Sequence, residues 1–349
     1  MEAYLKNIRQ VVPYTPGEQP KQPDIIKLNT NENPYPPSPK VMEHVYKIDR
    51  LRMYPDPAVT ELVEAIADYK GLDKEQVFVG VGSDDVLAMC FMTYFNSELP
   101  ILFPDISYSF YDVWAELFRV PYETQPLDKD FRIVPDDYKK PNGGIIFPNP
   151  NAPTGLFMPL DEVESIIASN PDVIVIVDEA YVDFGGESAQ SLLEKYENLI
   201  VVQTFSKSRS MAGMRIGYAM GSKTLIKALN DVKYSFNSYT MNQPSILLGK
   251  ASIEDDEYFK KTCKAIIDTR EWVKEELCKL GFTFPDSKAN FIFATHKTHS
   301  AEEIFQAAKE NHIYVRYFKK PRIDNYLRIT IGTDEEMKSF IEFLKNYLK

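Results

Sequence analysis

The pattern of hydrophobic and polar residues changes twice along this chain. Residues 11–57 hold ten of the 24 prolines, and this density predicts an extended arm, because proline lacks a backbone donor and breaks helices. From residue 58, amphipathic stretches such as "AVTELVEAIADYKG" alternate with short apolar runs, as expected for helices and buried strands. After about residue 245, a Lys- and Glu-rich amphipathic stretch over 251–280 is followed by "ANFIFAT", "HIYVRYF" and "YLRITIG". This last part predicts a small α+β domain.

The middle of the chain repeats one kind of unit. "GGIIFPNPNAPTG" precedes the helix-like "LDEVESIIAS", "DVIVIVDEAYVDF" precedes the weaker helical stretch "AQSLLEKY", and "NLIVVQTFSKSRS" closes the series. Wholly apolar strands that alternate with helices are typical of a parallel sheet covered on both faces. We therefore predict an α/β fold. Residues 30–245 form a large domain with a mostly parallel sheet, and residues 1–29 and 246–349 form the arm and the small α+β domain.

The arm has a second interpretation, a disordered tail. The stretch "DIIKLNTNENPY" is too apolar and too rich in asparagine for a simple spacer. We therefore expect the arm to pack against the small domain.

Composition and charge narrow the possible partners. The chain of 349 residues has a net charge of −11 and no lysine or arginine block, which argues against nucleic acid or an anionic membrane as partner. Its three cysteines show no paired spacing, and its four histidines lie in no ligand-like or triad-like setting. We therefore predict no metal site and a reducing compartment. Without an apolar signal segment, the cytoplasm is the expected location.

Polar residues follow three successive apolar runs. Asn149 and Asn151 end the first, Asp178 and Tyr181 the second, and Ser206 and Lys207 the third. In open α/β sheets the ligand lies beyond the carboxyl ends of the strands. These six side chains are therefore expected to meet at one edge of the sheet.

A lysine in that position suggests a nucleophilic amine. A partly desolvated lysine can form an imine with a carbonyl, including the aldehyde of pyridoxal phosphate. That cofactor also needs an acid at its ring nitrogen, for which Asp178 is the candidate. Its phosphate needs a helix N-terminus and a cation, which "GSDD" and Arg215 with Ser206 can provide. Asp84 and Asp85 oppose a phosphate, so we interpret them as first-turn carboxylates that point away from it.

Other interpretations of these motifs fit less well. "GVGSDD" begins like a dinucleotide fingerprint, but Asp85 occupies the place of the third glycine. A serine–lysine hydrolase would need Ser206 and Lys207 on one side of a strand, yet adjacent residues on a strand face opposite ways. A solvated surface lysine is the simplest alternative for Lys207.

The chain resembles the fold type I aminotransferases, which depend on pyridoxal phosphate. The stretches that carry the resemblance run in the family's order over nearly the whole chain: "NENPYPPSP", "YPDP", "GSDD", "PDISYSFY", "NPNAPTG", "VDEAY", "TFSKSRSMAGMRIGYA" and "YLRITIGT". The first two stretches are most similar to the branch of the family that acts on histidinol phosphate, and related decarboxylases contain similar motifs. The resemblance implies the fold type I architecture, pyridoxal 5'-phosphate as cofactor, and a homodimer.

The resemblance also implies roles for individual residues. Lys207 would bind the cofactor covalently and move a proton at the substrate Cα, Asp178 would keep the ring nitrogen protonated, and Tyr181 would hydrogen-bond the phenolic oxygen. Tyr108 would stack on the ring, with a core aromatic as its alternative. The phosphate would be held by the backbone amides of Ser83 and Asp84, by Ser206 and Arg215, and by Tyr54 from across the dimer interface. Ala152 stands where the family usually has asparagine, so Asn151 is the candidate replacement.

Arg328 lies in a strand of alternating pattern, where Leu327, Ile329 and Ile331 flank it. A cation there must meet water or an anion, and a guanidinium fork suits a carboxylate. By resemblance it binds the glutamate carboxylate and, with Arg316, the phosphate of histidinol phosphate, while Tyr14 and Asn31 close the pocket. We therefore expect a transaminase that exchanges an amino group between histidinol phosphate and 2-oxoglutarate or glutamate.

Three alternatives to that transaminase stay open. They are a decarboxylase of a phosphorylated amino acid, a transaminase of aromatic amino acids, and a non-catalytic binding protein of the same fold. The first two keep the same cofactor site, so only the substrate pocket separates them from the leading expectation.

Overall fold

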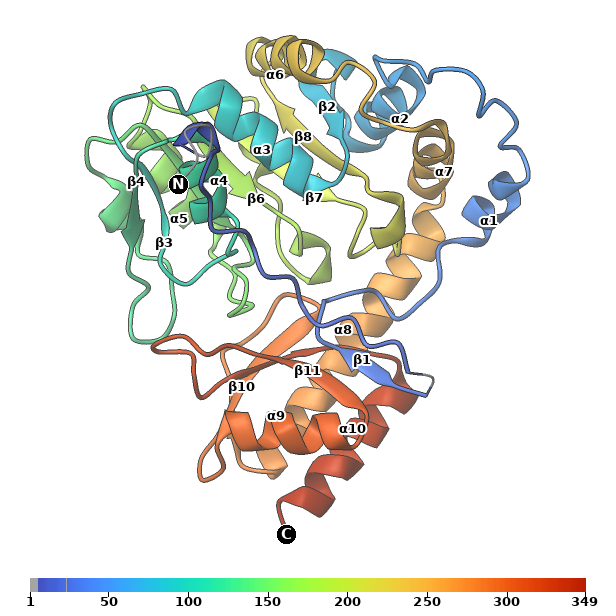
Figure 1. Cartoon of the computed structure of the whole chain (residues 1–349), viewed down its shortest axis with the longest axis vertical. Coiled ribbons are helices and arrows are strands. Elements are labelled where there is room, and N and C mark those ends of the chain that lie inside the picture. The colour runs from blue at the N-terminus through green and yellow to red at the C-terminus, as the bar shows by residue number, and fades with distance from the viewer. Residues whose placement is uncertain (1–5, 23) are drawn as a thin grey trace.

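The computed structural model describes residues 6–22 and 24–349, and two sheets organise it (Figure 1). The larger sheet has seven strands in the order β2-β8-β7-β6-β5-β3-β4. Their bounds are β2 Val77–Gly80, β3 Ile101–Pro104, β4 Tyr122–Gln125, β5 Gly144–Pro148, β6 Val175–Asp178, β7 Leu199–Thr204 and β8 Gly217–Gly221. Neighbouring strands are parallel except where β8 pairs with β2 and β7. This confirms the predicted mostly parallel sheet.

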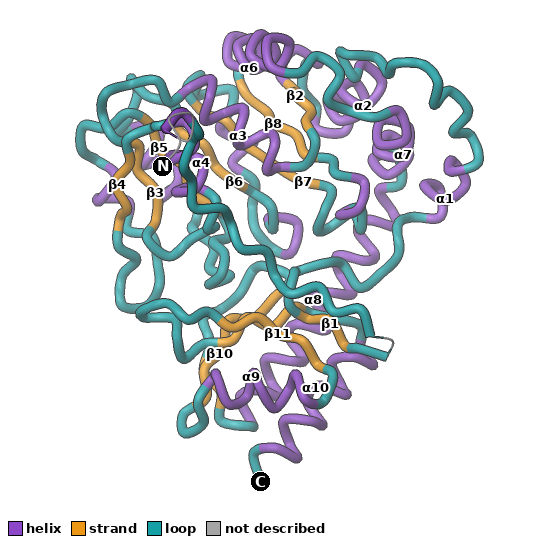
Figure 2. Tube along the Cα trace, in the orientation of Figure 1, coloured by secondary structure: helices purple, strands orange, loops and turns teal. Residues whose placement is uncertain are grey.

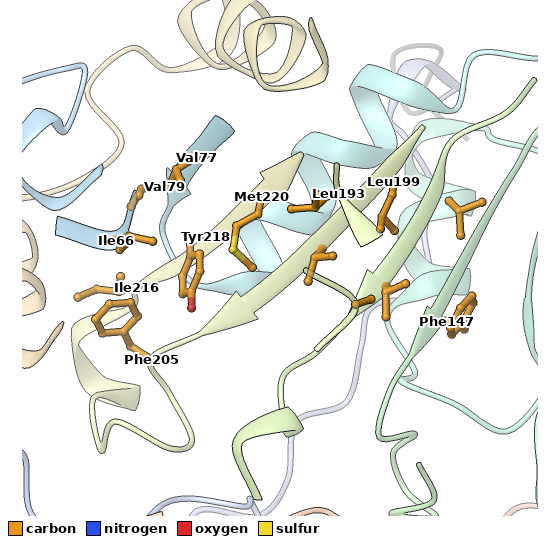
Figure 3. Close-up of a cluster of buried hydrophobic side chains, with 14 of the residues drawn as sticks. Ile66, Val77, Val79, Phe147, Leu193, Leu199, Phe205, Ile216, Tyr218 and Met220 are labelled. Atoms are coloured by element: carbon orange, nitrogen blue, oxygen red, sulfur yellow. The ribbon is translucent and has the colours of Figure 1, made fainter. Parts of the chain in front are cut away.

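Helices cover both faces of this sheet, as predicted. One face packs against α3 (Ser83–Tyr94), α4 (Tyr111–Phe118) and α6 (Lys223–Phe236). The other packs against α2 (Thr60–Lys70), α5 (Leu160–Ala168) and α7 (Gln243–Ile253). Strand β7 serves both layers, because successive side chains point to opposite faces. Its Ile200 and Val202 join the first layer and its Leu199 and Val201 the second. Figure 3 shows Leu199 among the buried side chains of the second layer.

The smaller sheet joins the arm to the C-terminal part of the chain. Its five strands run in the order β1-β11-β12-β10-β9, and β1 of the arm pairs in parallel with β11. Their bounds are β1 Ile26–Leu28, β9 Phe282–Thr283, β10 Phe291–His296, β11 Ile313–Tyr317 and β12 Leu327–Thr330. Helices α8 (Asp256–Lys279), α9 (Ala301–Glu310) and α10 (Asp334–Tyr347) bury their apolar residues against it. The remaining helix, α1 (Pro39–Val45), follows the arm.

The described part of the arm is extended. Residues 9–22 form no helix or strand, and Figure 2 shows this segment as a loop that crosses the molecule from the side of α4 to β1. Near its start, the ring of Tyr14 stacks on Phe110 with centroids 4.2 Å apart. The arm therefore contacts both the part of the molecule built on the seven-stranded sheet and the part built on the five-stranded sheet. The domain boundaries at residues 30 and 245 stay a prediction.

The structure refines two helical expectations. The weaker helical stretch "AQSLLEKY" forms only a short 3-10 helix, η5 (Ala189–Leu192), and the backbone N–H of Ala189 at its start donates to the buried Glu179 carboxylate at 2.6 Å. The amphipathic stretch 251–280 contains the last residues of α7, which ends at Ile253, and the whole of α8. The chain leaves the helical conformation at Asp255 (φ −105°, ψ 62°), and acids in the first turn favour a new start there. No helix in the described ranges is long and apolar enough to cross a membrane.

Candidate active site

A cavity opens where the carboxyl ends of β5, β6 and β7 meet the arm. Pro148 ends β5, Asp178 ends β6, and Thr204 ends β7, and all three line the cavity. Eight of the side chains singled out from the sequence line it too: Ser83, Asp84, Tyr108, Asp178, Tyr181, Ser206, Lys207 and Arg215. They converge because parallel strands place all their carboxyl ends at one edge of the sheet.

Lys207 lies just beyond β7, and its amine reaches into this cavity. Its Nζ donates to the backbone oxygen of Thr30 at 3.1 Å and lies 5.8 Å from the centre of the Tyr181 ring. The side-chain amide of Asn33 holds the backbone oxygens of Lys207 and Ser208 at 3.0 and 3.1 Å. Among the described residues Lys207 forms no ion pair. The arm thus positions the amine, but no carboxylate among the described residues pairs with its charge.

Asp178 is a buried carboxylate that faces the same cavity. Only 4% of it is exposed, and it accepts hydrogen bonds from Tyr111 Oη at 2.9 Å and from the backbone N–H of Ala180 at 3.3 Å. Burial raises the pKa of Asp178 to about 6, although both hydrogen bonds act against this rise. A buried acid of this kind suits a cationic partner such as a protonated pyridine nitrogen.

Sequence reasoning missed Tyr111. The motif "SYSFY" places three aromatic residues at the start of α4, and its spacing does not say which one reaches β6. Tyr108 instead donates to Asp84 Oδ1 at 2.7 Å.

The N-terminus of α3 and Arg215 form a second polar corner. Arg215 Nη1 lies 3.4 Å from Ser206 Oγ, and its Nη2 lies 3.4 Å from Asp84 Oδ2. Helix α3 begins at Ser83 after Gly82, whose φ is 87°. Backbone N–H groups at a helix start together with a guanidinium suit a phosphate. We expected the carboxylates of Asp84 and Asp85 to point away from the phosphate site. This is wrong for Asp84, whose carboxylate lies beside Arg215. Asp85 does turn away, and its carboxylate accepts from the N–H of Val81.

Two arginines stand side by side on the smaller sheet. Arg316 of β11 and Arg328 of β12 are direct register partners, so their side chains share one face. Arg328 Nη2 donates to Asn29 O at 2.7 Å, while its buried Nε has no hydrogen-bond partner among the described residues. Burial holds the pKa of Arg328 below its ordinary value, and the charge of Arg316 acts in the same direction. The two guanidinium charges lie side by side, and Arg328 Nε has an N–H without a partner among the described residues. A bound anion would offset the charges and accept from that N–H.

Asn31 connects Tyr181 to Thr330 of β12, the strand that also carries Arg328. The side-chain amide of Asn31 donates to Tyr181 Oη at 3.0 Å, and Thr330 Oγ1 donates to Asn31 Oδ1 at 2.9 Å. The ring of Tyr14 stacks on Phe110. The substrate-binding roles of Tyr14 and Asn31 stay predictions.

Asn151 and Tyr54 lie outside the cavity. Asn151 donates to Ile106 O at 3.0 Å and to Thr154 Oγ1 at 3.2 Å, and Ala152 lines the cavity instead. The structure thus contradicts Asn151 as the replacement amide, because its backbone position turns the side chain toward a different loop. Tyr54 is 83% exposed, and its ring lies 4.8 Å from that of Tyr239. Thr30 and Glu32 line the cavity although sequence reasoning gave them no role.

Comparisons with known proteins point in one direction. Residues 23–344 match the family model described as aminotransferase class I and II. The chain is 52% identical over 351 aligned residues to a histidinol-phosphate aminotransferase of Clostridium botulinum (strain Okra / Type B1), which covers 100% of this chain and 99% of that protein. Its fold resembles the histidinol-phosphate aminotransferase of Clostridium acetobutylicum, with a TM-score of 0.86, 22% identity and coverage of 93% and 99%. It also resembles the Sinorhizobium meliloti histidinol-phosphate aminotransferase in complex with pyridoxal-5'-phosphate, with a TM-score of 0.83, 21% identity and coverage of 92% and 91%.

Proposed function

Since this chain belongs to the class I and II aminotransferases, we propose that it exchanges an amino group between L-histidinol phosphate and 2-oxoglutarate or glutamate, a step of histidine biosynthesis. The observation that carries the substrate is the 52% identity over the full chain to a histidinol-phosphate aminotransferase. The paired Arg316 and Arg328 support it, because both substrates carry an anion that two adjacent cations can bind.

The cavity fits pyridoxal 5'-phosphate as cofactor. Asp178 offers a buried carboxylate that has no cation bonded to it among the described residues, and the start of α3 with Arg215 and Ser206 offers a phosphate cradle. When bound, the cofactor supplies an aldehyde that reacts with amines and a protonated ring that withdraws electrons from the substrate Cα.

The residues of the chain then have separate tasks. Lys207 would hold the cofactor through its aldehyde and would carry a proton to and from the substrate Cα. Asp178 would keep the ring nitrogen protonated, since a buried carboxylate favours a neighbouring cation. Tyr181, itself held by Asn31, would donate a hydrogen bond to the phenolic oxygen, and Tyr108 would cover the ring.

The arginine pair holds the substrate anion in both half-reactions. Arg328 presents its unpartnered Nε to the carboxylate of glutamate or to the phosphate of histidinol phosphate. Arg316 adds a second cation beside it, which a doubly charged phosphate uses more fully than a carboxylate does.

We further propose that the enzyme works as a homodimer in the cytoplasm. Large apolar side chains stand exposed around α1 and the segment after it: Met42 53%, Tyr46 93%, Leu51 69%, Met53 55% and Tyr54 83%. Exposed apolar patches of this kind mark interaction surfaces. A second copy of the chain would cover this surface, and Tyr54 would then reach the cofactor phosphate of the partner.

A half-reaction screen tests this function. Purified enzyme loaded with cofactor is mixed with histidinol phosphate, with O-phosphothreonine or with phenylalanine, and the loss of the bound cofactor's absorbance is followed. We expect histidinol phosphate to react fastest, and 2-oxoglutarate to restore the starting spectrum. Release of carbon dioxide from the phosphorylated amino acid would establish the decarboxylase instead, and a preference for phenylalanine would establish the aromatic transaminase.

A chemical test addresses Lys207 directly. Borohydride reduction of the loaded enzyme should attach the cofactor to the peptide that contains Lys207, as mass spectrometry can show. An adduct on any other lysine contradicts this assignment.

A further inference from the structure

Glu32 is a cavity-lining acid that the transamination scheme leaves without a role. Three carboxylates line the cavity among the described residues, namely Glu32, Asp84 and Asp178. Asp178 is assigned to the ring nitrogen of the cofactor, and Asp84 accepts hydrogen bonds from Tyr108 and Arg215. Glu32 belongs to the arm, and the charge of Lys207 acts on it. Glu32 Oε2 accepts from Thr30 Oγ1, and the backbone oxygen of Thr30 accepts from Lys207 Nζ, so the carboxylate stands beside the amine.

One oxygen of Glu32 is held in place and the other is open. Lys27 Nζ and Thr30 Oγ1 both bond to Oε2, the latter at 2.8 Å. Oε1 has no hydrogen-bond partner within the part of the chain that the structure describes, and 44% of the side chain is exposed. A carboxylate restrained through one oxygen presents the other as an oriented acceptor.

Glu32 also keeps its charge in this setting. Partial burial acts against ionisation, but the hydrogen bonds from Lys27 and Thr30 together with the charges of Lys27 and Lys207 hold the pKa of Glu32 below its ordinary value. A charged acceptor makes a stronger hydrogen bond than a neutral one does.

We propose that Glu32 Oε1 accepts a hydrogen bond from the imidazole N–H of the amino donor and so selects it over donors with a phenyl ring. The inference rests on the proposed function and deepens it. The donor's phosphate is assigned to Arg316 and Arg328 and its amine to Lys207, so only the ring still lacks a recognising group. The imidazole differs from a phenyl ring by an N–H donor and by its readiness to carry a positive charge. A restrained carboxylate distinguishes the two rings on both counts.

The test compares two phosphate esters on enzyme loaded with cofactor. Histidinol phosphate and phenylalaninol phosphate share the amine and the phosphate, but only the first has a ring N–H. For Glu32→Ala we expect kcat/KM with histidinol phosphate to fall about 10- to 100-fold, the range for a lost hydrogen bond to a charged group. Glu32→Gln should fall less, because its amide oxygen still accepts. Phenylalaninol phosphate should change by less than about threefold in either variant.

A matched control and a binding measurement complete the design. Glu64 forms a comparable ion pair with Lys74 at 3.1 Å, but both side chains lie on the surface, so Glu64→Gln should leave both esters unaffected. The phosphate ester of 3-(imidazol-4-yl)propanol lacks the amine and binds without reacting. Its calorimetric Kd for the holoenzyme should weaken in Glu32→Ala by a similar factor, whereas that of 3-phenylpropyl phosphate should not.

The outcomes separate this inference from the proposed function. Equal losses for both esters would mean that Glu32 acts on the shared groups or on the fold, and unchanged rates for both would mean that the ring is bound elsewhere. Either result overturns the role of Glu32. A wild-type enzyme that takes an amino group from neither ester overturns the proposed function itself.

Discussion

At the scale of residues, the end of β6 separates two adjacent acids. Asp178 faces the cavity, whereas Glu179 is 2% exposed on the other side of the sheet, because neighbouring side chains on a strand point in opposite directions. Glu179 accepts from Ser188 Oγ and from the backbone N–H of Ala189, both at 2.6 Å, and from Gln203 Nε2 at 2.7 Å. One acid is thus available to a ligand, and the other fixes the segment that carries η5.

We expect Glu179 to make the stability of the protein depend on pH. Burial raises the pKa of Glu179 to about 7, against the effect of its hydrogen bonds. The folded state therefore favours the neutral acid. The stabilisation is complete below the unfolded pKa of about 4.3 and is lost as the pH rises through about 7, by up to about 4 kcal/mol.

Denaturant unfolding of cofactor-free protein between pH 4.5 and 8 measures this dependence. The variant Glu179→Gln should be less stable than wild type over this pH range, because its amide must turn an N–H toward another donor. Its free energy of unfolding should also vary less with pH than that of wild type. If the free energy of unfolding changed with pH equally in both proteins, Glu179 would not be the source of the pH dependence.

The arginine pair gives a second prediction at this scale. Arg328→Ala should slow the glutamate and histidinol-phosphate half-reactions together, since truncating one member of a buried charge pair costs about 2–5 kcal/mol, or roughly 30- to 5,000-fold in kcat/KM. Arg316→Ala should harm the histidinol-phosphate half-reaction more, because a phosphate dianion engages both cations. Single-turnover rates of each half-reaction decide this. An unchanged glutamate rate in Arg328→Ala would remove Arg328 from the carboxylate site.

At the scale of elements, β8 and the first turn of α3 are packed backbone to backbone. A Cβ on Gly217 would lie 2.3 Å from the backbone nitrogen of Ser83 and 2.4 Å from the carbonyl carbon of Gly82. No side chain fits at that distance, so the absence of a side chain at Gly217 lets β8 approach the helix start. The proposed phosphate cradle thus depends on a strand that contributes no polar side chain to it.

The variant Gly217→Ala should therefore weaken cofactor binding. Overpacking of about 1–3 kcal/mol corresponds to roughly 5- to 150-fold in Kd, measured by titrating cofactor-free protein with pyridoxal phosphate. Gly213 is the matched control, because a Cβ there meets nothing within 4 Å. If Gly213→Ala lost as much affinity as Gly217→Ala, the contact with α3 would not be the cause.

At the scale of the whole molecule, the apolar side chains around α1 and the segment after it stay exposed. The exposed aromatic pair Tyr54 and Tyr239 belongs to this surface. Buried beneath the same segment, Lys233 is 2% exposed and donates to Pro57 O. Lys233 therefore anchors the chain just after Tyr54 while Tyr54 itself points outward, as a side chain that serves a partner subunit would.

Hybrid dimers test whether Tyr54 acts across the interface. Tyr54→Ala and Lys207→Ala subunits, each inactive or weak alone, are unfolded together and refolded as a mixture. Mixed dimers then contain one site with both native groups, and random pairing should restore about a quarter of wild-type activity. Adding Arg215→Ala to the Tyr54→Ala subunit should abolish the recovery. If the simple mixture regains nothing, Tyr54 acts within its own subunit or not at all.

The sequence alone was sufficient for the sheet and for most of the strand-end groups. Apolar runs at regular spacing predicted a parallel sheet with helices on both faces. The polar residues after those runs predicted that Asp178, Tyr181, Ser206 and Lys207 would meet, although Asn149 and Asn151 turn to Met158 and Ile106 instead. Both inferences are local, because the period of a strand decides burial and the carboxyl ends of parallel strands share one edge. Lys207, Asp178 and Arg215 could therefore be placed without coordinates.

Only the tertiary structure decided which distant segments complete the site. Tyr111 reaches Asp178 across 67 positions of the chain, Asn31 reaches Tyr181 across 150, and Thr30 meets Lys207 across 177. No periodicity within a segment encodes such contacts. They depend on how the arm crosses the sheet edge and on which way each backbone turns, and these are fixed only when the two layers pack against each other.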